Sequence, residues 1–187
     1  YTRLNGQTCN EILECLKSLG YVVEAKVVCA SDYGVPQNRY RVLFIGKKTD
    51  DNNYEIAFPA KSNKPAPTIK DAIGKYPALE SGESSDIVNH EAMLHSQQMI
   101  EKMSYVKDGG GRDDIPVEIR PQKGDIRKYI RYDSTKPSIC ITGDMRKVFH
   151  YSQNRALTVR ELAAIQTYPD SFVFLGSKIL QQQMVGN

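Results

Sequence analysis

The most informative stretch of this chain is RALTVRELAAIQTYPDSF, residues 155–172. Thr158 and Glu161 lie three residues apart, the spacing of a capping box, in which each side chain accepts a hydrogen bond from the backbone N–H of the other residue. Apolar residues follow at the spacing of one helix face as far as Ile165. Pro169 then ends the pattern, because the residue before a proline avoids helical backbone. The stretch predicts a short amphipathic helix that begins after Thr158.

The first 50 residues predict one helix and two strands. Thr8 and Glu11 have the spacing of a second capping box, and Gly20 follows as a helix terminator. β-Branched residues then crowd YVVEAKVVC, a composition typical of a strand. The expected elements are a helix at 8–19, a strand at 21–29, a loop at 30–38 and a strand at 40–45. Because the loop is too short for a helical crossover, we expect the two strands to be antiparallel.

The composition changes after residue 50. Residues 59–67 are rich in Pro, Lys, Ser and Asn, which indicates a domain boundary nearby. The elements expected beyond it are a helix at 69–73 capped by Thr68 and Asp71, a helical segment within 90–106 that three glycines at 109–111 interrupt, a strand at 138–142, and a last helix at 178–185 that begins after Ser177. Residues 113–128 are polar and predict irregular structure.

Bulk composition is that of an ordinary globular protein. The chain has 187 residues, of which 40% are hydrophobic and 25% charged, and no apolar run approaches the roughly 20 residues of a membrane-spanning helix. The formal net charge of +3 does not by itself indicate a nucleic-acid partner. The basic residues are nevertheless grouped, as Arg39, Arg41, Lys47 and Lys48, as Arg120, Lys123, Arg127, Lys128 and Arg131, and as Arg155 with Arg160. From charge alone, solvated surface residues are the preferred explanation of such groups.

The four cysteines are Cys9, Cys15, Cys29 and Cys140. They form no C-x-x-C pair and lie at no zinc-ligand spacing from a histidine, so we expect no metal. None follows a proline. We expect reduced thiols in a cytoplasmic protein.

A second motif precedes the strand at 40–45. Gln37, Arg39 and Arg41 alternate, so in extended backbone their side chains point to the same face. Two guanidinium groups and an amide on one edge can bind a phosphate or the polar edge of a base. A polar strand face with solvated arginines is the alternative.

Three segments, in this order and spacing, resemble the late signature motifs of the DNA cytosine-5 methyltransferases. Gln37, Arg39 and Arg41 resemble the family's Q-x-R-x-R motif. Residues 155–172 resemble its R-x-L-T-x-R-E-x-A-x-x-Q-x-[FY]-P-D-x-F motif almost throughout, and Gly186-Asn187 resembles the start of its G-N-x-V-x-P motif. The resemblance covers the whole chain, and the residues KPSI at 136–139 and His150 are similar to the usual lead-in to the long motif.

This resemblance implies an α/β fold, with the edge of a Rossmann-like methyltransferase sheet beside a small, irregular target-recognition domain. Residues 1–50 would then be the C-terminal part of the catalytic domain, 51–153 the target-recognition domain, and 154–187 the helices that return to the catalytic domain. The family's F-x-G-x-G, Pro-Cys and Glu-Asn-Val segments are not in this chain. We therefore expect the chain to lack the nucleophilic cysteine and to transfer no methyl group by itself.

The resemblance also implies roles for individual residues. Family members flip the target cytosine out of the duplex and attack its C6 with a cysteine thiolate, so that C5 accepts the methyl group of S-adenosylmethionine. Arg41 would hydrogen-bond the extruded cytosine, Arg39 would support the DNA backbone or the catalytic loop, and Gln37 would order the local turn.

Further roles follow along the chain. Thr142, Arg146 and Lys147 would contact bases or phosphates, and Asn187 would approach the S-adenosylmethionine pocket of the intact enzyme. The residues expected to be structural are Arg155, Thr158, Arg160 and Glu161. The expected partners are double-stranded DNA and the missing catalytic half, with no membrane and no metal. S-adenosylmethionine is expected in the intact enzyme but not on this chain, and the location is expected to be cytoplasmic and DNA-associated.

Four hypotheses remain open from the sequence. The first is that the chain is part of a one-chain methyltransferase of a bacterial restriction–modification system, and the second is that it is one subunit of a split enzyme. It is otherwise a non-catalytic, sequence-specific DNA-binding module, or an unrelated α/β domain. The length of the motif at 155–172 argues against the last of these.

Overall fold

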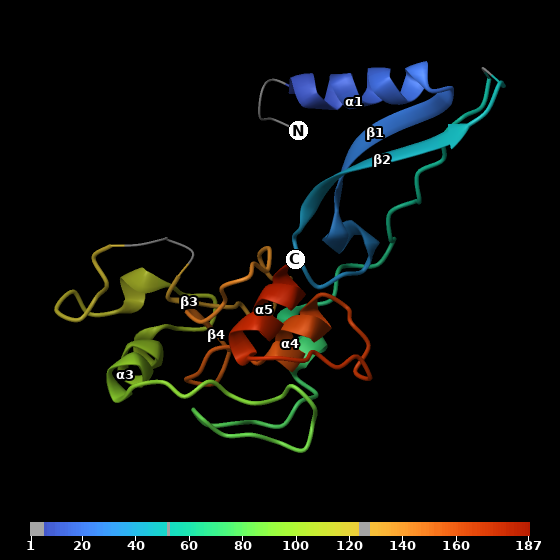
Figure 1. The fold of residues 1–187 in the computed structure, drawn as a ribbon. Helices are drawn as coiled ribbons and strands as arrows, with labels where there is room; N and C mark the ends of the chain where they lie inside the picture. The colour runs from blue at the N-terminus through green and yellow to red at the C-terminus, as the bar shows by residue number, and fades with distance from the viewer. Residues whose placement is uncertain (1–5, 52, 124–127) are drawn as a thin grey trace.

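The computed structural model describes residues 6–51, 53–123 and 128–187, which form an N-terminal helix and hairpin beside a larger body (Figure 1). The elements are α1 (Gln7–Ser18), β1 (Tyr21–Cys29), η2 (Ala30–Tyr33), β2 (Tyr40–Lys48), α2 (Ile69–Ile73), α3 (Gln97–Tyr105), η3 (Arg112–Asp114), β3 (Ile130–Arg131), β4 (Val148–Phe149), α4 (Val159–Ile165) and α5 (Lys178–Gly186). The predicted mixed α/β class is confirmed. Over the described ranges, no helix has both the length and the apolar character needed to cross a membrane.

The N-terminal hairpin matches the prediction closely. β1 and β2 pair antiparallel, with Tyr21 opposite Lys48 at one end and Cys29 opposite Tyr40 at the other. α1 packs against β1, and Gly20, with φ 84°, provides the left-handed backbone that turns the chain from helix to strand. β2 continues three residues past the predicted end, and the predicted loop contains the short helix η2.

The capping box predicted at Thr8 and Glu11 is wrong. The residue that precedes α1 is Gly6, in left-handed backbone with φ 80°, and no side chain caps the helix. Thr8 therefore already lies inside the helix, where it cannot take the extended backbone that a capping residue needs. Glu11 instead accepts a hydrogen bond from the side chain of Gln7 at 2.8 Å.

The main core of the body lies around α4. α2 and α5 pack on this helix, and the core includes Ile69 and Ile73 of α2, Leu162 and Ile165 of α4, and Val185 of α5. A smaller cluster, made of Met103, Val106, Ile115, Tyr129 and Phe149, joins the end of α3 to β4. The parallel pair of β3 and β4 is only two residues long, so side-chain packing rather than a sheet holds this part of the chain together.

The predicted caps in the body are confirmed. Both α2 and α4 begin with a complete capping box, formed by Thr68 with Asp71 and by Thr158 with Glu161. Ser177 caps α5 through its side chain, which accepts a hydrogen bond from the backbone N–H of Leu180.

Two predicted elements of the body are shorter than the sequence indicates. The apolar pattern from residue 90 becomes helical only at Gln97, because Ser84 and Glu91 form a β-bridge that holds the preceding segment extended. The strand predicted at 138–142 is reduced to one bridge between Ser138 and Gln37. It ends there because the backbone N–H of Arg39 bonds the carbonyl of Gln37 in a turn instead of continuing the ladder.

Candidate nucleic-acid interface

The alternating side chains before β2 converge on one distant segment. Arg39 Nη1 donates to the carbonyl of Ile141 at 3.1 Å and lies 3.4 Å from Cys140 Sγ. Arg41 Nη2 lies 3.9 Å from the same sulfur. Gln37 Oε1 accepts from the backbone N–H of Ile141 at 3.5 Å. All three side chains therefore reach the same segment, although a turn between Gln37 and Arg39 replaces the extended backbone that the prediction assumed.

The two arginines differ in how firmly they are held. Arg39 is partly buried and anchored to the carbonyl of Ile141. Arg41 is exposed, and its Nη1 donates only to the carbonyl of its neighbour Tyr40, at 2.7 Å. Its Nη2 makes only the long contact with Cys140 Sγ, and the side chain is exposed, so an external acceptor can reach the guanidinium.

Gln37 is fully buried and ties two segments together. Around it, Asn38 N–H donates to the carbonyl of Ser138 at 2.8 Å, and Ser138 N–H donates to the carbonyl of Pro36 at 2.9 Å. Within the described chain, neither Gln37 Nε2 nor Ser138 Oγ has a hydrogen-bond partner. The position of Gln37 suits a residue that orders the turn rather than one that contacts DNA.

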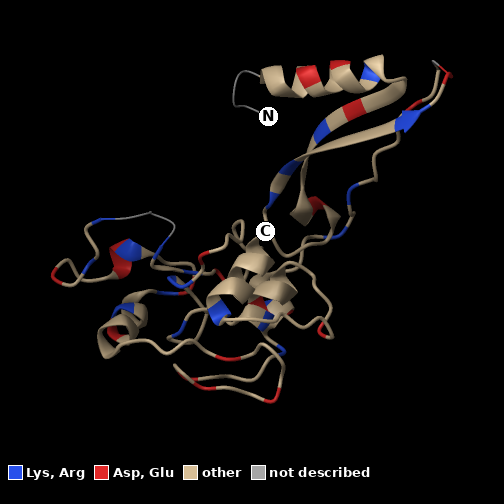
Figure 2. Cartoon of the chain, in the orientation of Figure 1, with Lys and Arg blue, Asp and Glu red and all other residues tan. Residues whose placement is uncertain are grey.

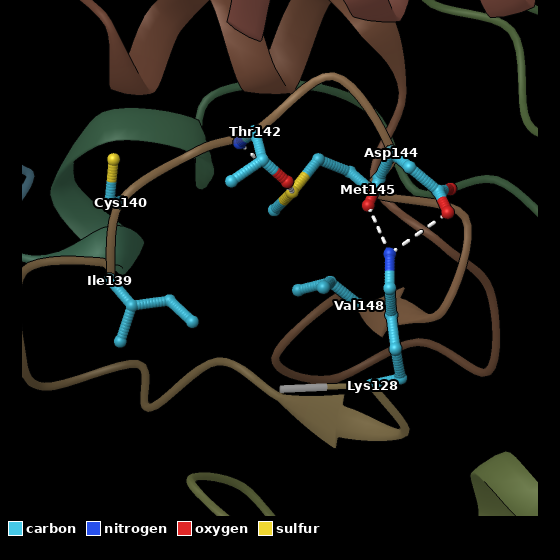
Figure 3. Close-up of a pocket in the computed structure, with 7 residues that line it drawn as sticks. All are labelled: Lys128, Ile139, Cys140, Thr142, Asp144, Met145 and Val148. Carbon is cyan, nitrogen blue, oxygen red and sulfur yellow. Dashed lines mark hydrogen bonds and ion pairs between the residues drawn. The ribbon is translucent and has the colours of Figure 1, made fainter. Parts of the chain in front are cut away.

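A small hollow lies beside this junction (Figure 3). The residues that line it are Lys128, Ile139, Cys140, Thr142, Asp144, Met145 and Val148, around a volume of about 30 Å³. That volume holds a water molecule or two but not a nucleobase. Thr142 lies at its edge, with its backbone N 3.4 Å and its Oγ1 3.6 Å from Met145 Sδ.

A larger, basic hollow lies next to the first. Its volume is about 200 Å³, and its lining residues are Arg112, Lys123, Lys128, Tyr129, Asp144, Arg146 and Lys147. Lys128 and Asp144 line both hollows, so the two are neighbours. Lys147 Nζ lies 4.9 Å from the centre of the Tyr129 ring, where cation–π attraction holds the ammonium group. Basic residues elsewhere are spread over both parts of the chain (Figure 2), so this hollow, rather than net charge, marks a candidate surface for phosphates.

Asp144 is the acidic residue within this basic hollow. Its Oδ1 accepts from Arg146 Nε at 2.9 Å, and its Oδ2 lies 3.0 Å from Lys128 Nζ (Figure 3 draws the Lys128 contact). The hydrogen bond from Arg146 and the ammonium of Lys128 hold the pKa of the Asp144 carboxyl far below its ordinary value. Asp144 is therefore ionised at neutral pH.

The C-terminal residues reach the same region. Gly186, the last residue of α5, lies so close to Thr142 and Gly143 that a Cβ at this position would stand 2.5 Å from Gly143 N. The closeness explains why glycine is needed here. Asn187 N–H donates to the carbonyl of Gln183 at 3.0 Å, and Asn187 lines neither hollow.

The polar residues of the long motif are buried. Arg155 and Glu161 form a two-pronged ion pair, with Nη1 to Oε2 at 2.8 Å and Nη2 to Oε1 at 2.7 Å. Glu161 also accepts the backbone N–H of Thr158 at 2.8 Å. Arg160 donates to the backbone carbonyls of Val88, Pro169 and Phe172. These contacts join α4 to distant loops, and none of these side chains is free to meet DNA.

Arg131 is a residue whose position the sequence did not indicate. The sequence grouped it with the basic surface residues, but it is buried. Its guanidinium donates to four backbone carbonyls and one side-chain oxygen, namely those of Met103, Val106, His150, Gln153 and Asn154. Burial lowers the pKa of Arg131. The only feature of the nearby sequence that could have indicated its burial is that its neighbours, Ile130 and Tyr132, are apolar. Arg127, of the same predicted group, lies outside the described residues.

Comparison with known proteins identifies the family. The sequence pattern described as C-5 cytosine-specific DNA methylase matches residues 1–187. The chain belongs to this family. It is 61% identical, over all of its 187 residues and 50% of the relative's length, to the Type II methyltransferase M1.HphI of Haemophilus parahaemolyticus. It is 35% identical to M.MthTI of Methanothermobacter thermautotrophicus, with 90% of the chain and 52% of that relative aligned.

The fold agrees with this assignment. An E. coli DNA modification methyltransferase encoded within a prophage superposes on the chain with a TM-score of 0.73 at 22% identity, covering 100% of the chain and 61% of that structure. The prediction of a methyltransferase-type α/β fold is thereby confirmed. The chain spans about half the length of the curated relatives it matches.

Proposed function

We propose that this chain is the DNA-recognition and cytosine-positioning part of a bacterial type II DNA (cytosine-5-)-methyltransferase. The observation that carries the proposal is the meeting of Arg39 and Arg41 with residues 140–141, next to a hollow lined by five basic side chains. A guanidinium with free donors and an adjoining track of cations are the two features needed to hold an extruded base and its flanking phosphates.

In this proposal the two arginines have different roles. Arg41, with exposed donors, hydrogen-bonds the extruded cytosine, whose ring nitrogen and carbonyl are acceptors. Arg39, anchored on Ile141, keeps the 140–142 segment beside Arg41 and supports the DNA backbone. Gln37 orders the turn that carries both arginines.

The basic hollow would bind the DNA backbone and so fix the position of the protein along the duplex. Lys147 and Arg146 line it and would contact phosphates, while Thr142, which lines the smaller hollow, would contact a base edge. Asn187 stays a proposed neighbour of the cofactor. Arg155, Thr158, Arg160 and Glu161 would act through the fold, because all four are buried.

S-adenosylmethionine, when bound, supplies the methyl group. We propose that the described residues do not form its site by themselves. Asn187 lines neither of the two hollows described above, nor a further hollow that is lined by Gly109, Gly110, Tyr132 and their neighbours. We propose that the cofactor site and the nucleophile belong to a catalytic half on the same polypeptide or on a separate subunit, and that this chain alone transfers no methyl group.

Exposed apolar residues support a partner half. On the hairpin, Val27 is 49% exposed and Leu43 43% exposed. On α5, Ile179, Leu180 and Met184 are each about half exposed. Leu180 and Met184 lie four residues apart on one face of α5, and an exposed apolar stripe of this kind suits an interface, which favours a missing half over a stand-alone DNA-binding module.

The division of the chain is part of the proposal. Residues 1–50 and 154–187 would complete the catalytic domain, and 51–153 would be the target-recognition domain. The complete protein would work in the cytoplasm on double-stranded DNA.

The test is methyl transfer from radiolabelled S-adenosylmethionine to duplex DNA. We expect none with the purified chain, and transfer to cytosine C5 once the chain is joined to or mixed with its catalytic half. In that active protein, Arg41→Ala should reduce kcat by 10²-fold or more, whereas Lys17→Ala on the exposed face of α1 should leave it unchanged. Methyl transfer by the chain alone, or full activity of the Arg41 variant, would contradict the proposal.

A further inference from the structure

The basic hollow contains one carboxylate whose position is unfavourable for binding DNA. Among the described residues that line the two neighbouring hollows, Asp144 is the only acidic one, against five basic residues. It lies at their junction, about half exposed, where a phosphate held by the surrounding cations would be close to a second negative charge. Such a like-charge contact opposes binding.

Both oxygens of Asp144 are occupied by cations that the hollow would otherwise offer to DNA. Arg146 Nε bonds Oδ1 at 2.9 Å, and Lys128 Nζ lies 3.0 Å from Oδ2 and 2.5 Å from the backbone carbonyl of Asp144. The Lys128 side chain is only 21% exposed, so it is held in the junction rather than extended into solvent. A phosphate can engage either cation only by displacing the carboxylate or by tolerating its charge.

We propose that Asp144 is a specificity-determining residue, which competes with DNA phosphates for Lys128 and Arg146 and thereby weakens binding to DNA without the recognised sequence. Non-specific binding comes almost entirely from phosphate contacts, so a competitor for the cations penalises it most. A recognised sequence adds base contacts that offset the penalty. The carboxylate therefore acts as a repulsive element that raises the ratio of specific to non-specific affinity.

The inference rests on the proposed DNA-recognition function, and one substitution tests it. Asp144→Asn keeps the size of the side chain and removes its charge. In the complete protein, we expect it to tighten binding to a fluorescent duplex of random sequence. If one freed cation forms a new contact with a DNA phosphate, the slope of log K against log salt becomes steeper by about 0.9. Extrapolated from 1 M salt, this corresponds to about 8-fold tighter binding at 0.1 M salt. Release of both cations would double the change in slope.

A matched control separates this effect from net charge. Asp170 also forms an exposed ion pair, with Lys75 at 2.5 Å, but lines neither hollow. Asp170→Asn changes the net charge by the same amount and should alter the affinity by less than twofold. In a protein that already carries Lys128→Met and Arg146→Met, Asp144→Asn should no longer tighten binding, because the cations it releases are gone.

The outcomes are distinct. If the parent protein binds the duplex and Asp144→Asn binds it equally or more weakly, the inference is overturned and the proposed function stands. A weaker Asn variant would show that Asp144 orders the cations or reads a base amino group. If the parent shows no salt-dependent binding at 50 mM NaCl, the proposed function fails, and this inference fails with it. Asp144→Ala should change affinity in the same direction as Asp144→Asn, and urea midpoints identify any variant that fails to fold.

Discussion

Replacing Glu161 by alanine should remove a large part of the stability of this protein. Glu161 and Arg155 are 1% and 0% exposed, and the substitution leaves the guanidinium buried without its carboxylate. Breaking a buried pair in this way costs about 3–5 kcal/mol, and losing the bond to Thr158 N–H costs about 1 kcal/mol more. Most domains are stable by only about 5–15 kcal/mol.

Equilibrium urea unfolding measures this loss directly, and a thermal scan should show the melting temperature lowered by roughly 6 °C or more. Asp170→Ala removes an exposed ion pair with Lys75 and a hydrogen bond from the Tyr76 hydroxyl, and should cost less, about 1–2 kcal/mol. The double variant Arg155→Met with Glu161→Leu should be more stable than Glu161→Ala, because it leaves no unpaired charge. A cost below about 1 kcal/mol for Glu161→Ala, or no coupling in the double variant, would refute the reasoning.

Three further perturbations follow from the same structure. Burial lowers the pKa of His150 from 6.5 to about 4, so between these pH values the unfolded chain binds a proton that the folded chain does not. The free energy of unfolding should therefore fall by on the order of 3 kcal/mol as the pH is lowered from 6.5 to 4. The urea midpoint of His150→Gln should vary less with pH over the same range. Gly186→Ala should lower the free energy of urea unfolding by about 1–3 kcal/mol, because its Cβ would collide with the Gly143 backbone. Met184→Ala, on the exposed face of α5, should change that free energy little. Equal stability of both variants would contradict the close packing. Arg131→Lys keeps the charge but has too few donors for five acceptors, so differential scanning calorimetry should show clear destabilisation, and an unchanged melting temperature would mean that the five contacts are dispensable.

The two predicted capping boxes show where local pattern stops being sufficient. Thr158 and Glu161 cap α4 as predicted, yet the same spacing at Thr8 and Glu11 lies inside α1. Threonine caps a helix only if its own backbone is extended, and the chain around α1 becomes helical one residue earlier, after Gly6. The sequence contains the capping-box spacing in both places, but the backbone around it decides whether the threonine side chain caps the helix.

The sequence by itself determined the local elements and the family. β-Branched runs and a short loop were sufficient for the antiparallel pair β1–β2, because strand propensity and loop length act between near neighbours. The capped helices α2, α4 and α5 follow for the same reason. The three motifs were sufficient for the family because they combine many residue identities at fixed spacing.

Only the tertiary structure decided which charges are available to DNA. Arg39 and Cys140 are 101 residues apart in the chain, and their contact depends on a turn held by the buried Gln37. Arg131 looked like its basic neighbours in sequence but became an internal donor, because carbonyls from two distant segments surround it. Asp144 meets Arg146 locally, two residues along the chain, but its contact with Lys128, 16 residues away, depends on the fold. Burial and charge pairing depend on segments far apart in the chain, so no local pattern can reveal them.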